Sequence, residues 1–209
     1  MKPSEREPQI IWLQAAESTN SELKRHIGTL DNLSIIAVRE QTAGRGQGDH
    51  TWHSAPGENL TFSVLLRFGK DCPLAASEVL LITQMTTLAI RSYLLRRGVA
   101  ARIKWPNDIW VGGKKICGIL IENGLQDGWV RESIVGIGLN LNQRNWPPEL
   151  PNPVSLSELT GRRYVPHREL AALHKEICRH FGLLGTGDGR VFLQEEFGKY
   201  LFRLPEGPR

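Results

Sequence analysis

The amino-acid sequence predicts a single α+β domain in which helices flank a mostly antiparallel sheet. Four strand patterns follow one another between residues 102 and 141, most of them joined by short turns. Helical patterns precede and follow them, without the regular βαβα alternation of a doubly wound fold. The chain has 209 residues, 40% of them hydrophobic, which is enough to bury one full core. We therefore treat residues 1–209 as one domain.

The first third of the chain predicts short elements around a long polar loop. Thr19 to Glu22 form a capping box, which predicts a helix reaching about residue 27. The glycine-rich loop over residues 39–56 is longer than most loops in compact domains, so we expect it to be functional. Strands are predicted over residues 10–13, 33–38 and 59–67, with the loop at 39–56.

The longest helix is predicted over residues 73–97, where apolar side chains recur at helical spacing until Gly98 ends the pattern. We assign this stripe to the core. The Pro-rich stretch 147–153 is expected to be irregular. The remaining predicted strands cover 102–105, 107–111, 115–125 and 128–141, and the remaining helices cover 155–160, 166–184 and about 190–201.

A hairpin is predicted at Gly112-Gly113, in the block KWPNDIWVGGKKICGILIE. Antiparallel pairing across this turn brings Asp108 and Lys115 to the same end of the sheet. The apolar run 116–121 suits a strand buried on both faces. A lysine at the entrance of such a strand, beside an acid, indicates a site for an anion.

Composition excludes several classes of protein. The formal charge is +4, from 26 basic and 22 acidic residues, and no basic run dominates. This favours a phosphorylated ligand or acidic partner over DNA. The N-terminus lacks a signal-peptide core, and no apolar stretch approaches the ~20 residues of a membrane span. The isolated cysteines Cys72, Cys117 and Cys178 predict a reduced, cytoplasmic setting.

The loop QTAGRGQGDHTW, residues 41–52, has the chemistry of a nucleotide site. Its glycines allow close backbone approach, Arg45 offers forked donors to carboxylate or phosphate, and Trp52 offers a flat apolar face. Neither a Rossmann nor a P-loop pattern is present, because no helix follows the glycines and no G-K-[S/T] occurs. The alternative is a solvated loop that needs glycine for its turns.

Four motifs in order, STN at 18–20, this loop, KWPND at 104–108 and GIGLN at 136–140, closely resemble the catalytic domain of biotin–protein ligases. The resemblance runs from about residue 10 to the final helix. It implies the fold of class II aminoacyl-tRNA synthetases and lipoate ligases, a mixed sheet with helices packed on one side. It also implies ATP with Mg²⁺ as cofactor and biotin as substrate.

The resemblance implies roles for residues at matching positions. Hydroxyl and amide groups read the ureido ring of biotin, and Arg45 meets its carboxylate. The implied biotin site is Ser18, Thr19, Asn20, Gln41, Gly44, Arg45, Gly46, Gln47, Lys115 and Gly118. For Thr19 the alternative role is helix capping.

The implied ATP and adenylate site is Arg45, Trp52, Asn107, Lys115, Gly138 and Asn140. The catalytic set is Lys115, Arg45 and Asp108. Lys115 stabilises charge between the carboxylate and the α-phosphate, and Asp108 helps the carrier lysine lose its proton. Mg²⁺ is carried with ATP, near Asp108, and no metal is held by protein alone. Alternatives are a turn at Asn107 and Asp108, and a core position for Trp52.

The sequence departs from the family at the loop and at both ends. The family loop runs Gly-Arg-Gly-Arg-Arg-Gly, whereas this chain has Gln47, Gly48, Asp49 and His50 after Gly46. We expect a more weakly held adenylate. We also expect no N-terminal DNA-binding domain, and a C-terminal small β-barrel domain that is lost or truncated after about residue 205.

The function implied is ATP-dependent synthesis of biotinyl-5′-adenylate and transfer of biotin to a lysine of a biotin carboxyl carrier protein, such as that of acetyl-CoA carboxylase. The alternatives are a lipoate or octanoate ligase of the same fold and a non-catalytic biotin or adenylate sensor. We expect a cytoplasmic monomer or homodimer that binds neither DNA nor membranes.

Overall fold

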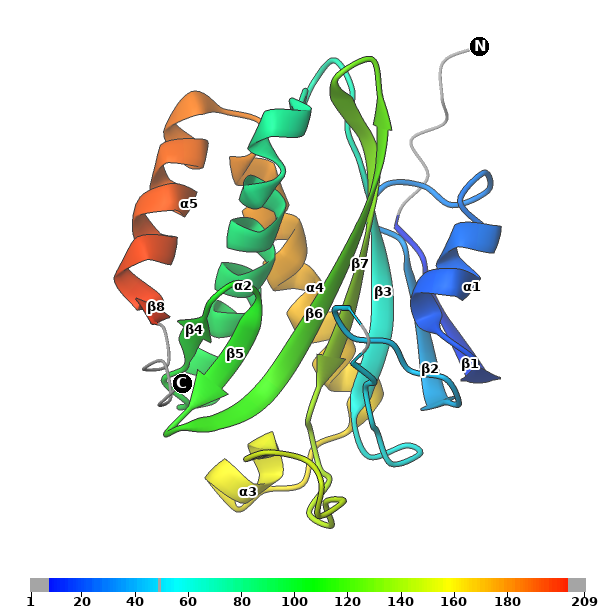
Figure 1. The fold of residues 1–209 in the computed structure, drawn as a ribbon, viewed down its shortest axis with the longest axis vertical. Helices are drawn as coiled ribbons and strands as arrows, with labels where there is room; N and C mark the ends of the chain where they lie inside the picture. The colour runs from blue at the N-terminus through cyan, green and yellow to red at the C-terminus, as the bar shows by residue number, and fades with distance from the viewer. Residues whose placement is uncertain (1–7, 49, 203–209) are drawn as a thin grey trace.

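The computed structural model describes residues 8–48 and 50–202, which form one mixed sheet covered by helices (Figure 1). Its strand order is β1-β2-β3-β7-β6-β5-β4-β8. Only the pairs β1–β2 and β4–β8 are parallel. The strands are β1 (Ile10–Ala16), β2 (Ile35–Gln41), β3 (Leu60–Arg67), β4 (Arg102–Lys104), β5 (Asp108–Val111), β6 (Lys114–Gln126), β7 (Trp129–Leu139) and β8 (Leu201–Phe202). The predicted fold class is confirmed.

The helices form two unequal layers. The helices α2 (Leu80–Leu95), α4 (Pro166–Leu183) and α5 (Gly187–Tyr200) cover one face of the sheet, whereas α1 (Thr19–Arg25) lies on the other face (Figure 1). The short α3 (Leu156–Thr160) lies at one end. The predicted one-sided layer thus holds for the three long helices, while α1 is the exception.

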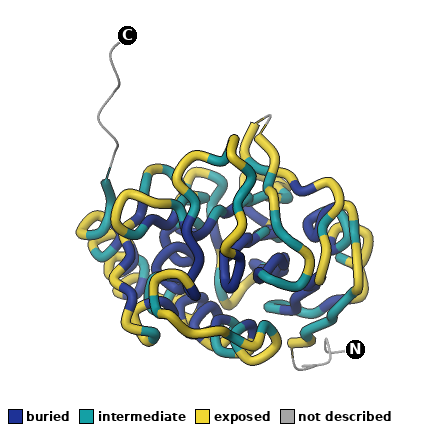
Figure 2. The backbone as a smooth tube through the Cα atoms, turned by 90° about the horizontal axis from the view of Figure 1, so that it is seen from below, coloured by how far each residue is buried: buried dark blue, intermediate teal, exposed yellow. Residues whose placement is uncertain are grey.

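The alternation of side chains along the strands supplies both cores. Ile35 belongs to the large core under α2, α4 and α5. Its neighbour Ile36 points the other way, into a small core with Leu23 of α1, Leu65 and Ile134. Figure 2 shows the buried segments gathered in the middle of the molecule, with exposed loops around them.

The predicted hairpin at Gly112 and Gly113 is confirmed. Both residues have positive φ, 55° and 80°, which glycine adopts without strain, and β5 and β6 pair antiparallel across them. The expected burial of 116–121 on both faces holds for Ile116, Cys117 and Ile119. Gly118 and Leu120 are half-buried because they line a cavity.

The predicted capping box at Thr19 is wrong. Ser18 is the N-cap residue of α1 and makes no side-chain cap bond, and Thr19 is the first helical residue. The Oε1 atom of Gln41, on β2, accepts a hydrogen bond from the Thr19 backbone N–H at 2.8 Å. A long-range partner therefore satisfies a donor that a local cap satisfies in most helices.

Other predicted element boundaries differ from the observed ones where contacts with distant residues override the local sequence pattern. The predicted helix over 73–97 begins only at Leu80, because Ala75 bridges to Trp129 and a 3-10 turn, η1 (Ala76–Glu78), follows. The loop begins after Gln41, because β2 continues to that residue. The final helix starts at Gly187, where the Thr186 side chain caps it, and β8 follows it.

Within residues 8–48 and 50–202, none of the helices is long and apolar enough to cross a membrane. The expectations about Asp49, the first residues and the chain after about residue 205 concern positions outside the described residues.

Candidate functional site

A cavity of about 260 Å³ opens between the loop after β2, the start of α1 and the centre of the sheet. Every predicted site residue lines it except Gly44 and Asn140. The lining residues among those predicted are Ser18, Thr19, Asn20, Gln41, Arg45, Gly46, Gln47, Trp52, Asn107, Asp108, Lys115, Gly118 and Gly138. Residues 18–20, 41–52, 104–108, 115–118 and 136–138 thus meet at one place.

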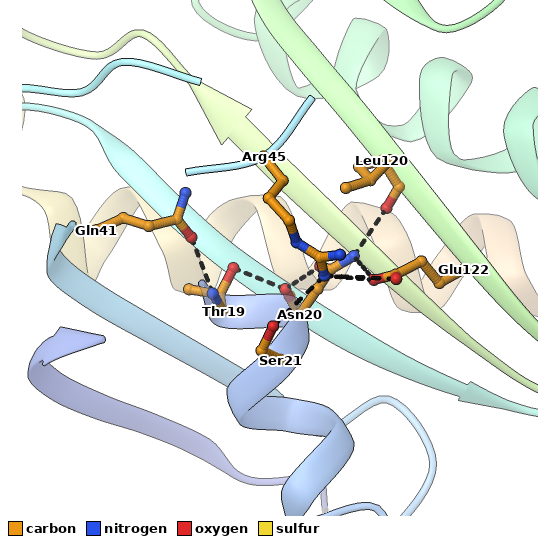
Figure 3. A network of polar contacts seen from close by, with 8 residues as sticks. Thr19, Asn20, Ser21, Gln41, Arg45, Leu120 and Glu122 are labelled. Atoms are coloured by element: carbon orange, nitrogen blue, oxygen red, sulfur yellow. Dashed lines mark hydrogen bonds and ion pairs between the residues drawn. The ribbon is translucent and has the colours of Figure 1, made fainter. Parts of the chain in front are cut away.

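One end of the cavity is a network of small polar side chains (Figure 3). The hydroxyl of Ser63, fully buried on β3, is hydrogen-bonded to the Thr19 hydroxyl at 2.8 Å and to Asn20 Oδ1 at 2.6 Å. Asn20 Nδ2 donates to Glu122 at 2.7 Å. Because Gln41 Oε1 accepts from the Thr19 backbone, its amide nitrogen is the group left to face a ligand. This end offers both donors and acceptors.

Arg45 enters the cavity from the loop and meets α1 and β6 (Figure 3). Its Nη2 atom lies 3.2 Å from Glu122 Oε2 and 3.5 Å from Ser21 Oγ. The loop folds back on itself around it, because the Trp52 backbone N–H donates to Gly44 O at 3.0 Å. Gly44 thus supports the loop and lies behind the cavity wall.

Lys115 and Asp108 form an ion pair at the opposite end of the cavity, with Nζ and Oδ1 2.8 Å apart. This is the arrangement that the hairpin predicts. The Lys115 side chain is 32% exposed, so its charge is available to a ligand. The neighbouring Asn107 donates from Nδ2 to Ile119 O at 2.5 Å, which ties the turn after β4 to β6. Asn107 thus has at least a structural role.

Trp52 separates this cavity from a second one of about 460 Å³. Trp52, Asp108 and Lys115 line both cavities, as does Lys104. The indole lies against Gly118 and Gly138, where a Cβ atom would approach ring atoms to 3.0 and 2.2 Å. The second cavity is therefore walled by an aromatic ring and lies within reach of the same cation.

Asn140 lines the second cavity and is almost fully buried. Its Nδ2 donates to Val154 O at 3.1 Å and to Lys115 O at 3.3 Å, which fixes the start of β6. Among the described residues its Oδ1 has no hydrogen-bond partner, nor has the indole N–H of Trp52 or Trp110, both also on this cavity. Buried polar atoms without partners are costly, so these three atoms are exceptions around this cavity.

The predicted site residues omit several residues of the site. Ser63 and Glu122 hold the predicted residues from behind, and Trp110 and Lys104, the first residue of the KWPND motif, line the second cavity. Ser63 carried a signal, because a serine inside an apolar strand pattern needs a polar neighbour when buried. Across residues 8–48 and 50–202, no group of three or more His, Cys, Asp or Glu could hold a metal ion.

The fold and the site together define an α+β domain with two adjoining cavities, in which Lys115 lines both cavities and Arg45 lines the first. A model of the biotin/lipoate A/B protein ligase family matches residues 12–140. The chain belongs to this family.

Relatives of known name agree with that assignment. A biotin–[acetyl-CoA-carboxylase] ligase of Paracoccus denitrificans is 33% identical over 181 residues, covering 83% of this chain and 73% of the relative. The bifunctional ligase/repressor BirA of Bacillus spizizenii is 37% identical over 137 residues, covering 62% of this chain. The chain covers 40% of that relative's length, and the same share of the Bacillus subtilis protein.

Solved structures match over almost the whole chain. The biotin protein ligase from Aquifex aeolicus in complex with biotin and ATP is 27% identical, with a TM-score of 0.78 over 95% of this chain and 84% of that one. The biotin protein ligase from Leishmania major in complex with biotin is 26% identical, with a TM-score of 0.76 over 98% and 88%.

Proposed function

We propose that the protein activates biotin with ATP to biotinyl-5′-adenylate and transfers the biotinyl group to a lysine of a biotin carboxyl carrier protein. The observation that carries this proposal is the placement of Lys115 between two cavities that share Trp52 as a wall. A reaction that joins a carboxylate to a nucleotide needs two neighbouring sites with positive charge where the anions meet.

The first cavity suits biotin better than an acyl chain. A ureido ring has N–H donors and a carbonyl acceptor, and Ser18, Thr19 and Gln41 supply hydroxyl and amide groups at one end. Lipoate and octanoate place hydrocarbon or sulfur there and would leave the remaining donors, such as the Gln41 amide nitrogen, without a ligand partner, which lowers affinity. The lipoate and octanoate ligase reading is therefore disfavoured.

In the adenylation step, an oxygen of the biotin carboxylate attacks the α-phosphorus of ATP and diphosphate leaves. Arg45 and Lys115 offset the repulsion between the two anions, and Trp52 provides a face for the adenine ring. Mg²⁺ bound to ATP neutralises phosphate charge. Asp108 is the one carboxylate among the described lining residues of the first cavity, which fits an ion that keeps phosphate and water ligands.

In the transfer step, the neutral amine of the carrier lysine attacks the carbonyl carbon of the mixed anhydride, AMP leaves and an amide forms. The amine must lose a proton. Asp108 is the nearby acceptor, and its carboxylate is paired with Lys115 at 2.8 Å. We therefore assign it to orienting the amine and receiving its proton as AMP departs.

The test is biotin-dependent exchange of labelled pyrophosphate into ATP, run beside lipoate and octanoate. Exchange with biotin alone, followed by biotin transfer to a carrier domain, is the expected result. Exchange with lipoate or octanoate instead would identify the acyl ligases. Tight biotin binding without exchange would identify a sensor, in which the cations serve binding only.

We further propose that the protein is cytoplasmic, because Cys72, Cys117 and Cys178 are all free thiols. The choice between monomer and homodimer, the lack of DNA binding and the identity of the carrier remain predictions. Size-exclusion chromatography with light scattering addresses the first, and a salt-dependent DNA-binding titration addresses the second.

A further inference from the structure

Glu122 stands behind Arg45, outside the lining of either cavity, and holds that arginine in place (Figure 3). It lies on β6, beyond the apolar run. Its carboxylate accepts hydrogen bonds from Arg45 Nη2 at 3.2 and 3.4 Å and from Asn20 Nδ2 at 2.7 Å. It is the last residue of the block KWPNDIWVGGKKICGILIE, and none of the four motifs includes it.

The guanidinium of Arg45 is anchored through one nitrogen. Nη2 contacts Glu122 and Ser21, while no contact within residues 8–48 and 50–202 involves Nε or Nη1. A guanidinium carries five N–H donors in a rigid plane, so fixing one nitrogen sets the direction of the others. Arg45 lines the cavity, and its remaining donors are available to an anion.

Glu122 is itself held by the sheet. Asn20 is 3% exposed, and its Oδ1 accepts from the buried Ser63 hydroxyl at 2.6 Å while its Nδ2 donates to Glu122. This arrangement fixes the orientation of the Asn20 amide, because both ends have partners. The chain of contacts therefore runs from β3 through α1 to β6, and ends on the loop arginine.

The strength of the Arg45–Glu122 ion pair decides whether Glu122 competes with the ligand for Arg45 or orients Arg45 toward the ligand. The side chains of Arg45 and Glu122 are 48% and 38% exposed, and ion pairs that exposed change an equilibrium by at most about fivefold. A hydrogen bond between the same guanidinium and a carboxylate or phosphate ligand changes it by roughly ten- to 150-fold. The pair is too weak to keep Arg45 from an anion, yet strong enough to favour one rotamer.

We propose that Glu122 is a positioning residue, which orients the Arg45 guanidinium toward the biotin carboxylate and the α-phosphate. This inference rests on the proposed function. It assigns Asn20 to the same task, because both of its polar groups are bonded to the protein. Glu122 acts through Arg45 and touches no substrate.

The test is a double-mutant cycle between Glu122 and Arg45, read by biotin-dependent pyrophosphate exchange and by calorimetric titration with biotin. Glu122→Ala should lower kcat/KM for biotin about fivefold, the most that an ion pair this exposed contributes. In the Arg45→Ala background the same change should have less than a twofold effect. Glu122→Gln, which keeps an acceptor for Asn20, should lose about threefold and serves if the alanine variant does not fold.

The matched control is Glu58→Gln, which removes the carboxylate from another exposed ion pair, with Arg163 at 2.9 Å, outside the lining of both cavities. It should leave both readouts unchanged. Higher activity in Glu122→Ala would show that Glu122 competes with the ligand, and full additivity with Arg45→Ala would show a structural role. Either result overturns the inference.

The two proposals are separable in these measurements. If the unsubstituted chain shows no exchange with biotin, the proposed function fails. Biotin affinity then decides the role of Glu122, because binding of the biotin carboxylate needs no ATP. Equal affinity in the unsubstituted protein, both single variants and the double variant would refute the positioning role.

Discussion

The contact between Trp52 and Gly138 allows a sharp test, because one methyl group should displace the wall between the two cavities. A Cβ atom at Gly138 would lie 2.2 to 2.5 Å from three atoms of the indole ring. Ordinary contacts between such atoms are ~3.5–4.0 Å, so the ring must retreat by about 1 Å or more. Overpacking of this kind costs roughly 1–3 kcal/mol.

The cost of Gly138→Ala should appear in ligand binding, because the half-buried Trp52 lines both cavities. At about 1.4 kcal/mol per factor of ten, the overpacking cost of roughly 1–3 kcal/mol predicts that KM for ATP rises about five- to 150-fold in pyrophosphate exchange. The thermal midpoint should change little in comparison.

Gly124→Ala provides the matched control for this substitution. A Cβ atom there would approach Glu132 Oε1 to 2.2 Å, a similar overlap, but with the end of a flexible side chain on the same strand pair and outside both cavities. It should leave KM unchanged. A Gly138→Ala variant with normal KM for ATP would refute the assignment of Trp52 as the nucleotide wall.

Three further predictions concern the same fold. Lys115→Ala should reduce adenylation by about 10²–10³ in the exchange assay. Its folding should stay intact in a thermal melt, because its partly exposed pair with Asp108 is worth about 1 kcal/mol or less. Gln47→Arg should slow adenylate dissociation about ten- to a hundredfold in stopped-flow measurements, since it restores one charged contact worth roughly 1.5–3 kcal/mol, and equal rates would contradict this. Burial lowers the pKa of His180 and of His174, so the unfolded chain binds protons more readily than the folded one. The stability present above about pH 6.5 should be lost as the pH falls toward the folded pKa values, and His180→Gln should flatten the dependence of Tm on pH between about 7 and 5.

The sequence predicted those parts of the fold whose signals are local. The hairpin at Gly112-Gly113 needs only two residues that accept positive φ, and the consecutive strands carry their own apolar patterns. The helix at Thr19 was predicted, but its capping box was wrong, because the Thr19 backbone N–H is bonded to Gln41, which is remote in sequence. The start of α2 was missed because Ala75 pairs with Trp129, which no local pattern shows.

The site follows the same division. Motif order identified the lining residues, since each motif supplies a short segment and the sheet brings the segments together. Ser63 and Glu122 were not predicted, because they are hydrogen-bonded to Asn20 from positions 43 and 102 residues away in the sequence. A motif records which groups meet the ligand. The groups that fix their orientation are set by strand register, which the motif does not contain.

The loop departures make the orientation of Arg45 more consequential in this chain. Between residues 42 and 58 Arg45 is the only arginine or lysine, because Gln47 and Gly48 stand where the family has arginine. In a loop with several arginines, one side chain can be misoriented while the others still present positive charge to the adenylate. Here the loop's permanent charge depends on one guanidinium and on Glu122 behind it. Under the proposed function, Lys115, paired with Asp108 at the hairpin end, serves adenylation, and we expect retention of the adenylate to depend on that single loop cation.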